Sequence, residues 1–212
     1  PLFSPKKGSV ASLDGGMEVL IDALLSRLES LANVELRFDT HFDSPESASE
    51  VLATPLSSIV WAAPGMIENF RQTTLSIFVA GYQEDDVRHV PIGYGLLIPD
   101  KTVPISGILH ESDLHDSSRA PSGHRLFRIM VPHARWDLQE QTILEATKPF
   151  LGSKSPALFE KIGVRQIPTF LPGHLQKMTE KKCDCSYIGW SYSGVSITHV
   201  VDEIERMIEG IS

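Results

Sequence analysis

The stretch Gly189-Trp190-Ser191-Tyr192-Ser193-Gly194-Val195-Ser196-Ile197 joins a short predicted strand to a predicted amphipathic helix. Small residues in such a turn let the backbone approach a ligand closely, and the free N–H groups of the first helical turn favour an anion. The same pattern also suits a tight strand-to-helix turn that needs glycine for geometry alone. The stretch therefore predicts an α/β layer, and a ligand-binding role stays open beside a purely structural one.

Further α/β elements are predicted at both ends of the chain. Residues 185–189 form the strand before the turn, and the helix after it has one apolar face, made of Ile197, Val200, Val201, Ile204, Met207, Ile208 and Ile211. Near the amino-terminal end we expect a helix from Met17, a short strand over 34–38 and a loop over 39–56. The apolar run 57–64 predicts a strand buried on both faces, as in parallel sheets.

The middle of the chain has a different pattern, with β-rich runs separated by Pro, Gly, Asp and Ser. Four of these runs predict strands of an antiparallel or curved sheet: 73–82, 93–98, 103–110 and 124–131. A helix over 138–151 and a strand over 163–167 are expected to follow. The predicted fold class is therefore α+β, with α/β elements at both ends and an antiparallel sheet between them.

The composition excludes two classes of function. The chain has 212 residues, of which 42% are apolar, and this is enough for a packed core. Its net charge of −8 argues against a nucleic-acid partner, because phosphate binding needs clustered Lys and Arg. No stretch reaches the roughly 18 to 20 apolar residues of a membrane-spanning helix. The first residue is Pro1 and no signal peptide follows, so we expect an excised or processed segment.

Five segments, in order along the chain, resemble motifs of the protoporphyrinogen oxidase branch of the flavin-containing amine oxidoreductases. They are 12–17 (Ser-Leu-Asp-Gly-Gly-Met), 60–64 (Val-Trp-Ala-Ala-Pro), 93–99 (Gly-Tyr-Gly-Leu-Leu-Ile-Pro), 167–174 (Ile-Pro-x-Phe-x-x-Gly-His) and 189–197. In the last motif, Thr198-His199 replaces the usual Asn-Asp. Pro132-His133 also stands where the family often has Gly-Gly. The resemblance covers nearly the whole chain.

The resemblance implies a partial FAD-binding α/β layer joined to an antiparallel-sheet substrate-binding domain. The implied boundaries are 1–65 and 184–212 for the layer and 66–183 for the β-rich domain. FAD-contacting residues would be Phe42, Gly189, Gly194, Val195 and Ser196. Substrate-contacting residues would be Tyr94, Gly95, Leu97 and Met130. No catalytic acid or metal ligand is expected, because the cofactor carries the chemistry and the protein orients a flat apolar ring.

The implied activity is oxidation of a porphyrinogen, either protoporphyrinogen IX or coproporphyrinogen III, to the porphyrin in haem biosynthesis. In such enzymes the flavin N5 takes a hydride, and O₂ or another acceptor reoxidises the flavin. No Gly-x-Gly-x-x-Gly follows any predicted strand, so we expect a partner segment upstream that also binds FAD. The chain alone is expected to be inactive and to bind FAD poorly. A cytoplasmic location is expected, with peripheral association with a membrane left open.

Four alternatives stay open from the sequence. One is another flavin amine oxidoreductase, monoamine-oxidase-like or carotenoid-desaturase-like. A second is a non-enzymatic module that binds tetrapyrroles or proteins. A third is a serine hydrolase with Ser191 as its nucleophile. A nucleophile elbow has the motif Gly-x-Ser-x-Gly, and the second Gly of that motif comes one residue late here. The last is a metal site in the segment 110–116, which is rich in His, Asp and Glu but reads as a solvated polar loop.

Overall fold

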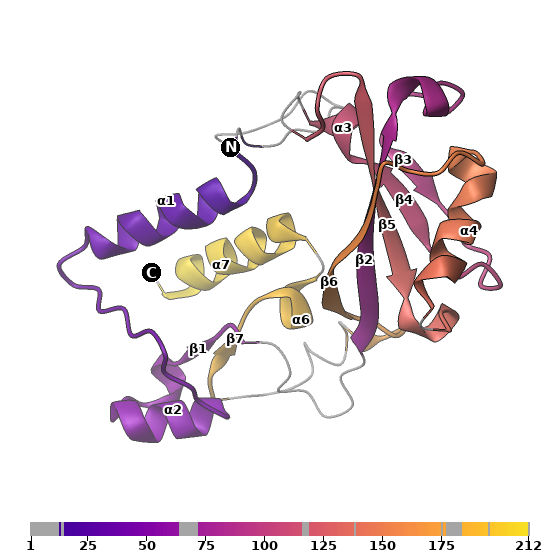
Figure 1. Ribbon diagram of the computed structural model, residues 1–212. Coiled ribbons are helices and arrows are strands. Elements are labelled where there is room, and N and C mark those ends of the chain that lie inside the picture. Colours follow the sequence, from indigo (N-terminus) through magenta and orange to yellow (C-terminus); the bar gives the residue numbers. More distant parts are fainter. Residues whose placement is uncertain are drawn as a thin grey trace. The chain divides into compact units, whose positions relative to one another are not determined.

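The computed structural model describes residues 13, 15–63, 72–115, 119–137, 139–174, 176, 184–194 and 196–211 (Figure 1). The chain divides into two compact units between Asp43 and Ser44. The second unit contains a five-stranded antiparallel sheet and a two-stranded parallel sheet, so the α+β prediction is confirmed. The boundaries predicted at 65/66 and 183/184 fall on or beside residues outside those described, and they stay predictions.

The first unit contains α1, Glu18–Glu29, where the sequence predicts a helix. Glu18 in its first turn and Arg27 in its last turn complement the helix dipole. The strand predicted over 34–38 is wrong: these residues have no strand assignment and no ladder partner among the described residues. Alternating side chains favour a strand, but a strand also needs a neighbour for its backbone N–H and C=O groups.

The second unit begins with α2, Pro45–Leu52, in a segment predicted to be a loop. That prediction is wrong because Ser44 caps a helix. The Ser47 N–H donates to Ser44 Oγ at 3.1 Å, and the Ser44 N–H donates to Ser47 Oγ at 3.1 Å. Pro45 occupies the first helical position, where a missing N–H costs nothing. The short helix η1, Leu56–Ser58, follows.

The small parallel sheet pairs two segments far apart in sequence. Strand β1, Val60–Trp61, aligns with β7, Ser186–Tyr187, in the register Val60↔Ser186 and Trp61↔Tyr187. The parallel direction agrees with the prediction for residues 57–64, whereas burial on both faces does not, because Val60 is 44% exposed. Two helices follow β7: α6, Trp190–Ser193, and α7, Ile197–Ile211. None of the described helices is long and apolar enough to cross a membrane.

The large sheet has the strand order β3-β4-β5-β2-β6. Its strands are β2 (Gln72–Gln83), β3 (Gly95–Leu97), β4 (Gly107–His110), β5 (His124–Pro132) and β6 (Leu158–Pro168). Helix α4, Glu140–Leu151, lies beside it, as predicted from the sequence (Figure 1). Three short elements complete the unit: η2 (Glu84–Val87), α3 (Glu111–Leu114) and η3 (His133–Arg135).

Side chains alternate between the two faces of the large sheet. One face carries the core, which includes Phe78, Tyr82, Ile108, Phe127 and Ile129 of the sheet together with Ile143 and Leu151 of α4. We call the opposite face the outer face. Paired strand residues place two rows of side chains there: Gly95, Leu109, Arg128 and Val79 in the first, and Leu97, Gly107, Met130 and Ile77 in the second.

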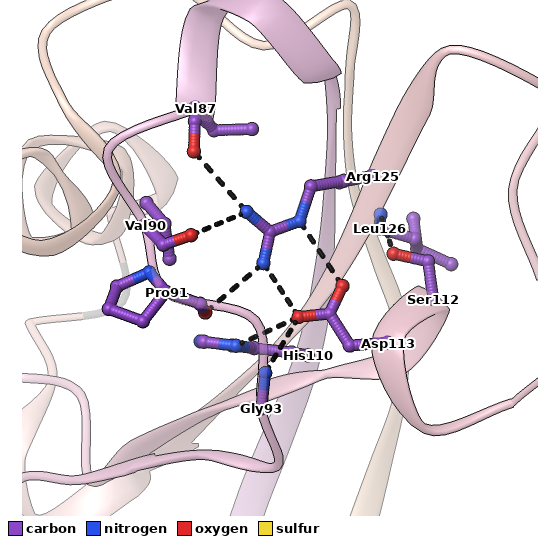
Figure 2. A network of polar contacts seen from close by, with 9 residues as sticks. All are labelled: Val87, Val90, Pro91, Gly93, His110, Ser112, Asp113, Arg125 and Leu126. Carbon is purple, nitrogen blue, oxygen red and sulfur yellow. Dashed lines mark hydrogen bonds and ion pairs between the residues drawn. The ribbon is translucent and has the colours of Figure 1, made fainter.

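A buried polar network lies at the end of β4 and β5 (Figure 2). Arg125 is 5% exposed, and its guanidinium donates to both carboxylate oxygens of Asp113, at 3.2 and 2.6 Å. The interpretation of 110–116 as a solvated loop is therefore wrong, because His110 and Glu111 are also buried. The described residues contain no cluster of His, Cys, Asp and Glu suited to a metal.

This network holds the segment before β3 in place (Figure 2). Arg125 also donates to the carbonyls of Val87, Val90 and Pro91, at 3.3, 2.8 and 3.4 Å. The Gly93 N–H donates to Asp113 Oδ2 at 3.2 Å. One buried ion pair thus satisfies four backbone groups that would otherwise lose their contacts with water. The chain therefore enters β3 along a fixed path.

Replacing Arg125 tests this anchoring. Arg125→Met leaves the Asp113 carboxylate buried without its cation, and the free energy of unfolding is expected to fall by about 3–5 kcal/mol. Arg88→Met is the matched control, because Arg88 pairs with Asp85 on an exposed surface and should change stability by less than about 1 kcal/mol. Urea denaturation measures both variants, and equal losses would contradict a special role for Arg125.

His110 gives the fold a defined pH dependence. Burial lowers the pKa of its imidazole below the ordinary 6.5, although the nearby Asp113 carboxylate opposes the shift. Its Nδ1 lies 3.3 Å from Asp113 Oδ2, yet neither ring nitrogen has a well-aligned hydrogen-bond partner among the described residues. The unfolded chain therefore binds a proton at a pH where the folded chain does not, and stability should fall as the pH drops below about 6.5.

Chemical denaturation between about pH 7.5 and pH 5.5 measures this dependence. His110→Phe keeps an aromatic ring against Phe127, whose centroid lies 5.2 Å away in an edge arrangement, and removes the titrating group. The variant should show a shallower loss of stability toward low pH than the parent chain. Identical slopes for the two proteins would assign the pH dependence to other groups.

Candidate functional site

The predicted turn after β7 is one short turn of helix, α6. The Tyr192 and Ser193 N–H groups donate to the Gly189 carbonyl at 2.9 and 2.8 Å. Ser193 Oγ returns to accept from the Gly189 N–H at 3.3 Å. We call the segment from Gly189 to Ser196 the corner. Its first part, Gly189–Ser193, is closed by its own backbone and hydroxyl groups.

Two positions in the corner require glycine. Gly189 and Gly194 have φ values of +108° and +121°, which side chains rarely tolerate. A Cβ atom on Gly194 would also lie 2.5 Å from His199 Nδ1 in α7. Ser196 then caps α7, because its Oγ accepts from the His199 N–H at 3.2 Å. The backbone conformation of the corner is thus the first explanation for the sequence pattern Gly-x₄-Gly.

Hydrogen bonds to other segments hold the corner. Tyr192 Oη donates to the Ala63 carbonyl at 3.4 Å, just after β1. His174 Nε2 lies 2.9 Å from the Ser191 carbonyl oxygen, so Nε2 carries the proton in this contact. Ser191 itself is 2% exposed. A buried serine whose carbonyl, rather than its hydroxyl, meets the histidine does not have the geometry of a nucleophile elbow.

A cavity of about 590 Å³ lies beside the corner. Its lining is mostly apolar and comes from β1, β2, β6, β7, α6 and α7 or the residues next to them: Ala62, Gln72, Gln166, Pro168, Ile188, Gly189, Trp190, Ser191, Tyr192, Ile197 and Val200. The volume falls within the range of small-molecule sites in proteins, about 300–1,000 Å³. The amides of Gln72 and Gln166 add hydrogen-bonding groups to this apolar wall.

The five residues predicted to contact FAD have different positions relative to this cavity. Gly189 lines it, whereas Gly194 and Ser196 belong to the same corner but are not among the lining residues. Val195 lies outside the described residues. Phe42 belongs to the first compact unit, so its role stays a prediction.

Three of the four residues predicted to contact substrate lie together on the outer face. Gly95, Leu97 and Met130 come from β3 and β5, and Gly107 of β4 stands between Leu97 and Met130. A Cβ on Gly107 would lie 2.9 Å from Met130 Cε and 3.3 Å from Leu97 Cδ2. The missing side chain therefore lets these two apolar side chains approach each other.

Glycine is also required at 95, and the residue before it lies outside the strand. Gly95 has a φ of +137°, and a Cβ there would collide with the Ile108 carbonyl oxygen. Tyr94 precedes β3, is 55% exposed and accepts at its carbonyl from the His110 N–H at 3.1 Å. None of the four predicted substrate residues lines the cavity. The cavity and the outer-face residues are thus separate surfaces, and residues of β2 belong to both.

Sequence reasoning missed part of the cavity wall. Gln72 and Gln166 were not predicted, and they join the wall because β2 pairs with β6 in the register Gln72↔Pro168 and Thr74↔Gln166. That register places both amides on one face of the sheet. A strand pattern shows which residues alternate, but it does not show which strand will lie alongside.

No family model matches the chain, and no curated protein resembles it in sequence. One solved structure with a similar fold is described as "Putative protoporphyrinogen oxidase from Exiguobacterium sp. 255-15". It superposes with a TM-score of 0.63 at 17% identity and covers 99% of this chain. The chain spans 53% of that structure's length. At this identity the likeness shows a common fold, which is shared with about half of the Exiguobacterium protein.

Substitution of Gly194 tests the geometry of the corner. Gly194→Ala is expected to cost about 1–3 kcal/mol of stability, because φ is positive and the new methyl group meets His199. Gly210→Ala is the control, since that glycine lies in α7 with no atom within 4 Å of an added Cβ, and it should be neutral or slightly stabilising. Urea denaturation compares them; a neutral Gly194→Ala would show that the corner relaxes.

Proposed function

We propose that this chain is the carboxy-terminal half of an FAD-dependent oxidoreductase that converts a porphyrinogen to the porphyrin. The observation that carries the proposal is the apolar cavity beside the Gly189–Ser196 corner, at the place where the sequence motif predicts cofactor contact. The fold shared with the Exiguobacterium structure supports it. The whole activity would require a further segment that supplies the rest of the FAD site.

The residues around the cavity fit a flat, largely apolar ring with a polar edge. Gly189 gives the backbone access to the cavity without a side chain in the way. Ile188, Ile197 and Val200 supply apolar contact, and the amides of Gln72 and Gln166 can hydrogen bond to ring nitrogen or oxygen atoms. Flavin, when bound, would accept two electrons in each turn, and its reoxidation by O₂ or another acceptor would allow the repeated turns that oxidation to the porphyrin needs.

Substrate contact is assigned to the outer face of the large sheet. Leu97 is 78% exposed, and Met130 is half-buried beside Gly107, so the face offers an apolar patch to a flat ring. The Arg125–Asp113 pair fixes the segment that leads into this patch. The protein's task is then to orient and desolvate the substrate, and no acid or base is required of these side chains.

A matched pair of substitutions on α7 tests the cofactor site. Val200 lines the cavity, whereas Val201 is 44% exposed and does not. In the full-length protein, Val200→Trp should fill the cavity and lower the FAD content of the purified protein at least fivefold, while Val201→Trp should leave it unchanged. Absorbance near 450 nm against protein concentration measures the ratio. If Val200→Trp kept its full FAD content, the cavity would not be part of the cofactor site.

Turnover of the full-length protein separates the substrate classes. We expect oxidation of protoporphyrinogen IX or coproporphyrinogen III, followed by porphyrin fluorescence, and no oxidation of a primary amine or a carotenoid precursor. Amine or carotenoid turnover alone would assign the chain to another flavin amine oxidoreductase. Stoichiometric flavin on the 212-residue chain by itself would contradict the need for a second segment.

A further inference from the structure

Two arginines on β5 have opposite environments. Arg125 points to the core face, and each of its three guanidinium nitrogens makes a hydrogen bond within the buried network. Arg128 lies three residues further along and therefore on the outer face, because side chains alternate along a strand. Its side chain is 38% exposed. Among the described residues, Arg128 Nη1 and Nη2 make no hydrogen bond, so these donors are available to a ligand.

On its own strand and the two adjoining strands, the neighbours of Arg128 on this face are apolar, and the next residue of its row beyond Val79 is Glu160 of β6. Arg128 aligns with Leu109 of β4 and Val79 of β2, and Leu126 and Met130 flank it on the same face of its own strand. The row continues to Gly95, one of the residues assigned to substrate contact. A cation within an apolar surface is suited to a ligand that combines an apolar body with a negative group.

Glu111 fixes the position of this cation. Its carboxylate is 5% exposed, and Oε1 lies 3.0 Å from Arg128 Nε, although that nitrogen is not aligned for a good hydrogen bond. The ion pair holds the inner edge of the guanidinium and leaves its outer edge toward solvent. Because Arg128 lies on β5 and Glu111 lies on α3, which packs against β5, the donors are positioned before a ligand arrives.

We propose that Arg128 binds a carboxylate substituent of the tetrapyrrole while the ring lies over Leu97, Gly107 and Met130. The inference rests on the proposed function and adds a determinant of substrate specificity to it. Guanidinium and carboxylate form paired, charge-assisted hydrogen bonds, which fix orientation as well as add affinity. The outer face would thus prefer tetrapyrroles that carry carboxylates over uncharged ones, and it would set the rotation of the ring in its plane.

Binding of protoporphyrin IX and of its dimethyl ester to the full-length protein tests the proposal, because the ester has the same ring without free carboxylates. Quenching of tryptophan fluorescence gives both dissociation constants. Arg128→Met should weaken binding of the diacid by about tenfold and binding of the ester by less than about twofold. Arg88→Met is the control, since Arg88 is exposed after η2 and pairs with Asp85; it should change neither constant.

A second variant covers the case in which Arg128→Met does not fold. The double variant Glu111→Gln with Arg128→Met removes the buried charge together with its partner, and it should show the same loss of preference for the diacid. Equal diacid binding by the parent protein and the folded variant, or an equal loss for acid and ester, would overturn the role of Arg128. If the full-length protein bound neither ligand, the substrate assigned under the proposed function would fail as well.

Discussion

The register of β2 determines the arrangement of the second compact unit. This strand pairs with β5 on one side and with β6 on the other over most of its length. Its first residue, Gln72, lines the cavity, and its middle residues, Ile77 and Val79, lie on the outer face. A shift of one residue would exchange the two faces, exposing Phe78 and Tyr82 and burying the opposite row. Both proposed surfaces therefore depend on the same strand pairing.

Elements with a strong local pattern could be predicted from the sequence. The apolar periodicity of α1, α4 and α7 and the alternation in the long strands need no partner to be recognised. Helix α2 was missed although its signal is local, because Ser44 and Pro45 mark a helix start only when the cap is given weight over composition. Residues 34–38 show the converse, since their alternation is real but they pair with no strand in the described part of the chain.

The only site residues that could be predicted from the sequence are those whose type is required by the backbone conformation. Gly95, Gly189 and Gly194 were singled out by motif, and all three have positive φ values that a side chain would strain. The wall of the cavity could not be predicted, because Ala62, Gln166 and Val200 meet through long-range pairing of β1 with β7 and of β2 with β6. Sequence spacing carries no information on such contacts.

Side chains alternate between the two faces along β5, and this gives its two arginines, Arg125 and Arg128, different environments. Arg125, on the core face, is surrounded by backbone carbonyls and a buried carboxylate, so its contribution is to the path of the chain into β3. Arg128, on the outer face, has one buried partner and an exposed outer edge. An arginine retained in an apolar patch lowers the affinity of that patch for uncharged partners, because the guanidinium would lose water without compensation. The same charge therefore favours a ligand that carries a carboxylate, as proposed for the tetrapyrrole, and disfavours purely apolar association.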